Sequence, residues 1–225
     1  MNVTDFAVSL LNAETARDRQ RSIGPSQIGD PCLRHLAYAL VSETDVPQKY
    51  WLGAVIGTAI HALLEERVGS REGAIVEQKV YIGELEGYGT INGSADLVLE
   101  DEKLLIDWKT TSRAKIKKLK DFVYGVKDDD ASRYTMQKYL AQTQLYAWGL
   151  NRSGIEVDKI SICFINRDGT CETDVWTYDL AYDESFAVAI WERLGGVWKE
   201  LQDGKHPQDY DAHPECYKCS IGIEG

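Results

Sequence analysis

The stretch GSADLVLEDEKLLIDWKTTS, residues 93–112, constrains the fold more than any other part of the chain. It contains two apolar runs of strand length separated by an acidic turn. Asp96 lies within the first run, and Asp107 and Lys109 lie within the second. Because an unpaired carboxylate is costly to bury, this placement predicts a metal ion or a reaction at these strands.

The remaining hydrophobic patterns predict helices, then strands, a helix, two strands and a final helix. Three early helices are expected. The first covers residues 3–21, the second is short, follows a Ser26 cap and carries Cys32, and the third covers residues 48–68. Strands are expected over 74–82, 88–100 and 103–110, a long helix over 132–151 ending at Gly154, a hairpin over 159–168 and 172–180, and a helix over 183–204. We expect the tail from residue 206 to be irregular.

Length and composition favour one domain over residues 1–225. Its core is expected at about 48–203, with an N-terminal helical segment, 1–47, packed against a cysteine-containing tail, 204–225. The opening residues lack a signal-peptide pattern, and no apolar run reaches membrane-spanning length. The expectation is a soluble cytoplasmic protein with no membrane partner.

The charge balance is acidic, with 25 Lys and Arg against 36 Asp and Glu and a formal net charge of −11. This argues against broad nonspecific binding of polyanions but not against a nucleic-acid site whose carboxylates hold cations. One run, RAKIKKLK, is basic and supplies Arg113, Lys115, Lys117, Lys118 and Lys120. It is either a solvated helix face or a phosphate contact, and its position after Asp107 favours phosphate.

Asp107 and Lys109 are two residues apart in a strand, so their side chains point to the same face, which Asp96 can approach from the neighbouring strand. Two carboxylates are suitable ligands for Mg²⁺ or Mn²⁺, and a nearby ammonium suits phosphodiester hydrolysis. Taken alone, an Asp-x-Lys triplet is common and more often a surface ion pair.

His61 is a candidate ligand on the preceding helix. Gly57, His61 and Glu65 recur every four residues along one helix face, from which His61 could reach the sheet. Taken alone, such a residue is more often a core histidine.

Two further patterns support the site. Gln142 and Tyr146 lie one helical turn apart and could present an amide and a phenol to a phosphate or base, although helix surface and core are the ordinary explanation. Glu77 lies in the strand before Asp96, as a third carboxylate of the site or as a plain strand-end charge.

The segments GTAIHALLEE, GSADLVLE, LLIDWKTT and QTQLYAWGL, in this order, resemble the PD-(D/E)XK nuclease superfamily, in particular its RecB-like branch of CRISPR-associated and phage-type exonucleases. The resemblance spans roughly residues 25–219, and the joint order is more specific than any single motif. The residues that match are His61, Asp96, Asp107, Lys109, Gln142 and Tyr146. Ala95 stands where the superfamily name has proline.

The resemblance implies an α/β fold with a central mixed sheet flanked by helices, a restriction-endonuclease-like core, and metal-dependent cleavage of DNA. In that branch His61, Asp96, Asp107 and the Trp108 carbonyl would bind Mg²⁺ or Mn²⁺. Lys109 would position or activate the attacking water, and Gln142 and Tyr146 would steady the lysine or the DNA backbone.

Five cysteines in a chain expected to be cytosolic make a disulfide framework unexpected. Cys163 and Cys171 read as structural strand and hairpin residues. Cys216 and Cys219 form a C-x-x-C motif, and the resemblance implies a [4Fe-4S] cluster held by one early cysteine, here Cys32, and three late ones. No cysteine follows Cys219, so His213 could complete a set for zinc or a cluster, or the last ligand lies beyond residue 225. Such a site would join the two terminal segments.

The leading hypothesis is a DNA exonuclease acting on ends or single strands in phage or bacterial recombination, repair or replication. A structure-selective or site-specific endonuclease of the same superfamily is the alternative. A catalytically idle DNA-binding subunit is disfavoured by the complete residue set, and a redox or metal sensor is the weakest alternative. Recombination or helicase proteins could be partners, and the oligomeric state is open.

Overall fold

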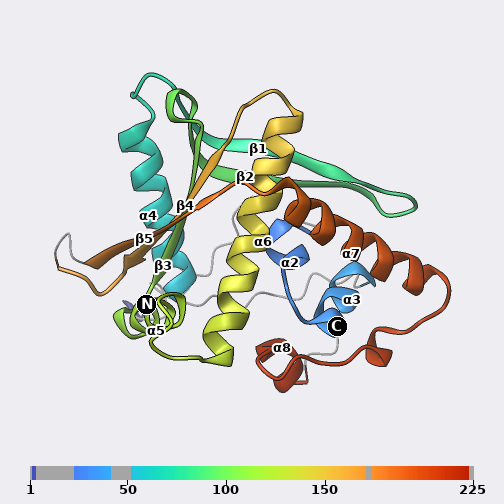
Figure 1. The fold of residues 1–225 in the computed structure, drawn as a ribbon. Coiled ribbons are helices and arrows are strands. Elements are labelled where there is room, and N and C mark those ends of the chain that lie inside the picture. Colours follow the sequence, from blue (N-terminus) through green and yellow to red (C-terminus); the bar gives the residue numbers. More distant parts are fainter. Residues whose placement is uncertain (1, 4–22, 42–51, 171–173, 223–225) are drawn as a thin grey trace.

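The chain is described by a computed structural model that covers residues 2–3, 23–41, 52–170 and 174–222. Its centre is a five-stranded sheet in the order β1-β2-β3-β4-β5 (Figure 1). The strands are β1 Ala74–Leu85, β2 Gly89–Leu99, β3 Leu104–Thr111, β4 Lys159–Asn166 and β5 Val175–Ala181. The pair β3–β4 is parallel and the other pairs are antiparallel. The sheet is therefore mixed, and all five strands agree with the hydrophobic patterns.

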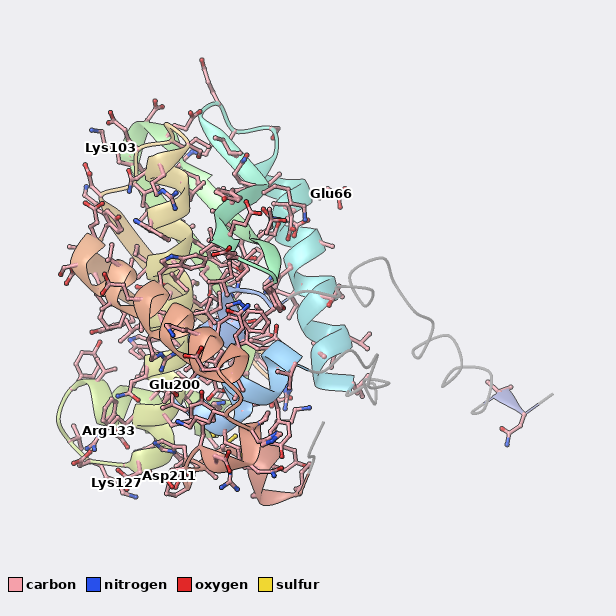
Figure 2. All side chains as sticks on the ribbon, turned by 90° about the vertical axis from the view of Figure 1, so that its right-hand side faces the viewer. Glu66, Lys103, Lys127, Arg133, Glu200 and Asp211 are labelled. Atoms are coloured by element: carbon pink, nitrogen blue, oxygen red, sulfur yellow. The ribbon has the colours of Figure 1, made fainter. Side chains whose placement is uncertain are left out.

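Helices cover the sheet. The α-helices are α2 Pro25–Ile28, α3 Leu33–Val41, α4 Leu52–Val68, α5 Arg113–Val123, α6 Asp130–Arg152, α7 Glu184–Gln202 and α8 Tyr217–Ser220, with short 3₁₀ turns η2 Glu100–Glu102 and η4 Pro207–Asp209. Figure 2 shows α4 on one side of the sheet and α6 and α7 on the other. Within the described ranges, no helix has the length and apolar character needed to cross a membrane.

The N-terminal helices differ from the expectation. Gly24, not Ser26, is the N-cap of α2, and its N–H donates to Gln27 Oε1 (3.0 Å). Pro25 explains the shift, because its fixed φ suits the first helical position and places Ser26 inside the helix. The single predicted segment is two helices, and Cys32 lies just before the second. The helix expected over 3–21 falls outside the described residues.

The long helix α6 confirms its predicted extent within two residues. It begins after Asp129, whose carboxylate accepts from Ser132 N–H (3.0 Å), and it is followed by Gly154 at φ +90°. Its buried face packs against β1 so closely that a Cβ on Gly149 would stand 2.4 Å from Val80 Cγ1. One apolar cluster joins α2, α3, β1, β2, α6 and α7, which gives the sheet a rigid backing.

Candidate active site

The candidate site begins where β2 and β3 separate. Their ladder ends at the pair Leu97–Ile106, while β3 continues to pair with β4 as far as Thr111. Beyond the last pair, Asp96 Oδ2 accepts a hydrogen bond from the backbone N–H of Trp108 (2.8 Å). A side-chain carboxylate thus replaces the missing backbone acceptor, which anchors Asp96 at the fork of the two strands.

Asp107 and Lys109 form a buried ion pair on β3. Asp107 is only 1% exposed, and its Oδ2 lies 2.6 Å from Lys109 Nζ. Burial raises the pKa of Asp107, although the neighbouring ammonium opposes this change. Burial also disfavours the charged form of Lys109, but Asp107 outweighs it and the pKa of Lys109 is raised. The lysine is therefore held as an ammonium.

A polar chain from α6 holds Lys109 in place. Its Nζ donates to Gln142 Oε1 (3.1 Å), and Gln142 Nε2 donates to the Tyr146 hydroxyl (3.2 Å). The ammonium also lies over the Tyr139 ring, 5.2 Å from its centroid. Gly93 of β2 leaves room for the phenol, since a Cβ there would meet Tyr146 Cε1 at 2.5 Å. Burial raises the pKa of Tyr146 to about 12, so it stays a neutral phenol.

His61 reaches the fork from α4. Its Nδ1 lies 3.5 Å from Asp96 Oδ1. Gly57, one turn earlier, lets α4 approach β3, because a Cβ there would stand 2.8 Å from Thr110 Oγ1. Burial lowers the pKa of His61, but the hydrogen bond and charge of Asp96 more than compensate, and the pKa is raised.

Glu65 and Glu77 join His61 in a second group of potential ligands. One ligand atom from each of the three residues lies within 4.8 Å of the others. Glu77 has a left-handed backbone, φ 49°, at a position where the β1–β2 register has no pair, between Val76 and Gln78. Such strain costs roughly 1–3 kcal/mol and clusters at functional sites. Ser94 Oγ donates to Glu77 Oε2 (2.8 Å) and fixes the carboxylate.

Glu65 was not among the residues chosen from the sequence, although its four-residue spacing from His61 was the signal that could have indicated it.

These residues suit a hard divalent cation. Carboxylate oxygens and an imidazole are the donors that Mg²⁺ and Mn²⁺ sites use. Asp107 Oδ2 is buried and accepts no hydrogen bond of regular geometry from the described parts of the chain. Its oxygen faces Lys109, while His61 contacts Asp96, so the predicted ligand set is gathered at one fork without forming one tight triangle.

An open groove leads into this fork between α4 and β3. It has a volume of about 330 Å³ and is lined by α4 from Gly53 to His61 and by β3 from Trp108 to Thr110. His61 and Lys109 both border it, so a ligand lying in the groove would reach the candidate catalytic residues.

The predicted basic run forms α5, which begins at the N-cap Ser112 directly after β3. Three of its basic residues, Arg113, Lys117 and Lys120, border a separate cavity of about 350 Å³ beside Trp176. Arg113 pairs with Asp174 (2.8 Å) and Lys117 with Asp121 (2.6 Å), so part of this positive charge is already neutralised. Lys115 and Lys118 are exposed outside this cavity.

The predicted cysteine cluster is assembled. The sulfur atoms of Cys32, Cys216 and Cys219 lie within 4.8 Å of one another, with Cys32 and Cys219 3.6 Å apart. His213 is not in this close group: its backbone N–H donates to Cys32 Sγ (3.3 Å), and its Nδ1 accepts from the Glu215 N–H (3.1 Å).

The other two cysteines lie apart from this cluster. Cys163 is buried in β4, where burial raises its thiol pKa to about 11, and Cys171 lies outside the described residues.

Asp30 organises the cluster and was missed in the sequence. This carboxylate is 1% exposed and accepts hydrogen bonds from Cys32 N (2.9 Å), Lys138 Nζ (2.8 Å) and the Tyr134 hydroxyl. It also lies 2.9 Å from His35 Nδ1. Burial opposes ionisation, but these partners hold the pKa of Asp30 well below its usual range. The loop carrying Cys32 is thereby fixed to α6.

The chain matches no protein-family model, and no curated protein matches it in sequence. Its fold recurs in solved structures. The protein SSO0001 aligns over 91% of this chain and 89% of its own, with 19% identity and a TM-score of 0.54. The alkaline exonuclease LHK-Exo from Laribacter hongkongensis aligns over 82% and 90%, with 14% identity and a TM-score of 0.54. A phage-related exonuclease from Haemophilus somnus aligns over 88% and 93%, with 13% identity and a TM-score of 0.50.

The chain is therefore an α/β protein with a mixed sheet flanked by helices, and it shares this fold with the two exonucleases. This confirms the predicted fold class. The likeness agrees with the resemblance to PD-(D/E)XK nucleases that the motifs carry. At such low identity, the activity has to be argued from the chain's own residues.

Proposed function

We propose that the protein is a metal-dependent deoxyribonuclease of the PD-(D/E)XK type that acts as an exonuclease on DNA. The observation that carries the proposal is the buried Asp107–Lys109 pair at a strand fork that also gathers Asp96 and His61. Shared fold with the two exonucleases supports it. The setting would be phage or bacterial recombination, repair or replication in the cytoplasm, with recombination or helicase proteins as partners.

Asp96, Asp107, His61 and the Trp108 carbonyl would hold Mg²⁺ or Mn²⁺. Glu77 and the neighbouring Glu65 would complete or polarise the same metal site. When bound, the cation lowers the pKa of water and offsets the charge that develops on the phosphate. A bound cation would also offset the cost of burying the Asp107 carboxylate.

Lys109 acts as a charged donor in this proposal. A lysine with a raised pKa is poorly suited to accept a proton but well suited to orient a water molecule and to stabilise a phosphorane-like transition state. Gln142 keeps the ammonium aimed at Asp107, and Tyr146 keeps Gln142 in place.

The three close cysteines would hold a [4Fe-4S] cluster or Zn²⁺ that joins the terminal segments. The fourth ligand would come from His213, whose backbone N–H already donates to Cys32 Sγ (3.3 Å). Two N–H groups, those of His35 and His213, point to Cys32 Sγ at 3.5 and 3.3 Å and would orient it as a ligand. Arg113, Lys115, Lys117, Lys118 and Lys120 would contact DNA phosphates.

The test is cleavage of end-labelled linear and circular DNA, single- and double-stranded, with Mg²⁺, Mn²⁺ or EDTA. Asp107→Asn is the inactive variant, and Asp101→Asn, which changes an exposed carboxylate in η2, is its matched control. Metal-dependent loss of linear DNA with circles spared is expected. Cleavage of circles would favour the endonuclease alternative, and a folded, metal-bound protein that cuts nothing would contradict the proposal.

A further inference from the structure

Arg167 lies beside Gly53, the residue of α4 that borders the groove farthest along the helix from His61. It follows β4, and its backbone N–H donates to Thr111 O (2.9 Å). Its guanidinium lies against the first turn of α4, because a Cβ on Gly53 would stand 2.3 Å from Arg167 Nη1. Gly53 borders the groove and precedes His61 by about two helical turns, roughly 12 Å.

The guanidinium is available for an outside partner. Among the described residues, Arg167 is exposed and its side chain has no ion pair or hydrogen bond. By contrast, Arg113 pairs with Asp174. The first turn of α4 carries no acidic residue that could compete. In a chain with a formal charge of −11, an exposed arginine with no ion pair among the described residues indicates that this end of the groove suits an anion.

We infer that Arg167 binds a backbone phosphate of a DNA strand lying in the groove between α4 and β3; this inference rests on the proposed nuclease function. The planar guanidinium matches two phosphate oxygens, and the groove, at about 330 Å³, has room for a nucleotide unit. A strand whose scissile phosphate lies beside His61 and Lys109 places a nearby phosphate at Arg167.

This contact sets the position of the DNA strand along the groove. Arg167 is held by the β3 and β4 backbones, and the candidate catalytic residues are held by β3 and α4, so the distance between the anchored and the cleaved phosphate is fixed by rigid elements. Arg167 is a positioning residue in this scheme. It selects which phosphodiester reaches Lys109 and does not itself touch the reacting atoms.

The experiment measures binding of a single-stranded oligonucleotide to the Asp107→Asn protein, with and without Arg167→Ala, over a range of salt concentrations. We expect Arg167→Ala to weaken binding about tenfold and to lower the slope of log K against log salt by about 0.7, the value for one phosphate on a single strand. Arg71→Ala removes the same charge at the exposed Arg71–Glu102 pair and should change neither quantity.

A second measurement identifies the contact itself. Oligonucleotides in which one phosphate at a time is a neutral methylphosphonate should bind less tightly at one position, and Arg167→Ala should lose that sensitivity there alone. An unchanged pattern, or a salt slope equal to that of Arg71→Ala, would overturn the inference. Cleavage by the wild-type chain tests the nuclease function separately. If the chain cuts DNA but fails these tests, only the phosphate-binding role of Arg167 is overturned. No DNA binding at all would overturn both.

Discussion

Lys109→Met removes the positive charge beside Asp107 and keeps most of the side-chain volume. In the wild type the two groups are 2.6 Å apart, and their side chains are 17% and 2% exposed. The variant leaves a buried carboxylate without its nearest cation. Breaking one partner of a buried pair typically costs about 3–5 kcal/mol. For a domain of this size, that corresponds to a melting temperature lower by roughly 10 °C.

The loss should depend on pH in a defined direction. Burial already raises the pKa of Asp107, and removal of Lys109 raises it further. A carboxyl whose folded pKa is raised stabilises the fold below its unfolded pKa, and that contribution is lost as the pH rises through the folded pKa. The difference in free energy of unfolding between variant and wild type should therefore be largest at neutral and alkaline pH and should become smaller in acid.

Thermal unfolding in EDTA from pH 4 to 9 measures this difference in stability. Two further measurements test its cause. Mg²⁺ should reduce the difference because a cation can replace the ammonium beside Asp107, and saturation at 100 times Kd stabilises by about 2.7 kcal/mol. The double variant Asp107→Asn/Lys109→Met should be more stable than Lys109→Met alone, since no charge is left unpaired. Equal stability of Lys109→Met and wild type at every pH would refute a buried, ionised pair.

Four further outcomes are expected. Tyr146→Phe removes the acceptor of Gln142 Nε2, so kcat should fall about 3–10-fold while DNA affinity stays constant, as steady-state kinetics will show. Glu65→Gln should raise the Mg²⁺ concentration for half-maximal cleavage about 10-fold without changing the melting temperature. Mn²⁺ affinity, measured calorimetrically, should fall as the pH drops through the raised pKa of His61, because only the neutral imidazole binds metal. Cys216→Ser should lower the melting temperature and remove bound iron or zinc in elemental analysis, with cleavage retained at low temperature.

Local periodicity was sufficient for the residues that share one element. The two-residue repeat of a strand placed Asp107 and Lys109 on one face, and the turn of a helix placed Gln142 beside Tyr146. All five strands were predicted for the same reason. The prediction of Ser26 as the helix cap was wrong because Pro25 takes the first position of the helix. The capping pattern alone does not include this local effect.

Residues that act through tertiary contacts could not be predicted in this way. Asp30 is an ordinary loop aspartate in sequence, and its role depends on Tyr134 and Lys138 of α6. Glu77 combines a left-handed backbone with a position opposite Asp96 that the β1–β2 register skips, and neither feature is visible in the strand pattern. Arg167 meets Gly53 through the packing of α4 on the sheet, which no sequence spacing encodes.

The cysteine cluster has a consequence for the order of events during biosynthesis. Cys32 and Cys219 lie 3.6 Å apart but at opposite ends of the chain, so their site cannot close until the tail has left the ribosome. Asp30 can dock the Cys32 loop onto α6 earlier, since its partners Tyr134 and Lys138 are synthesised well before the tail. Insertion of the proposed metal would then be a late step of maturation, and its loss would release the segment after Tyr210, which Arg34 holds independently, while the Cys32 loop stays docked.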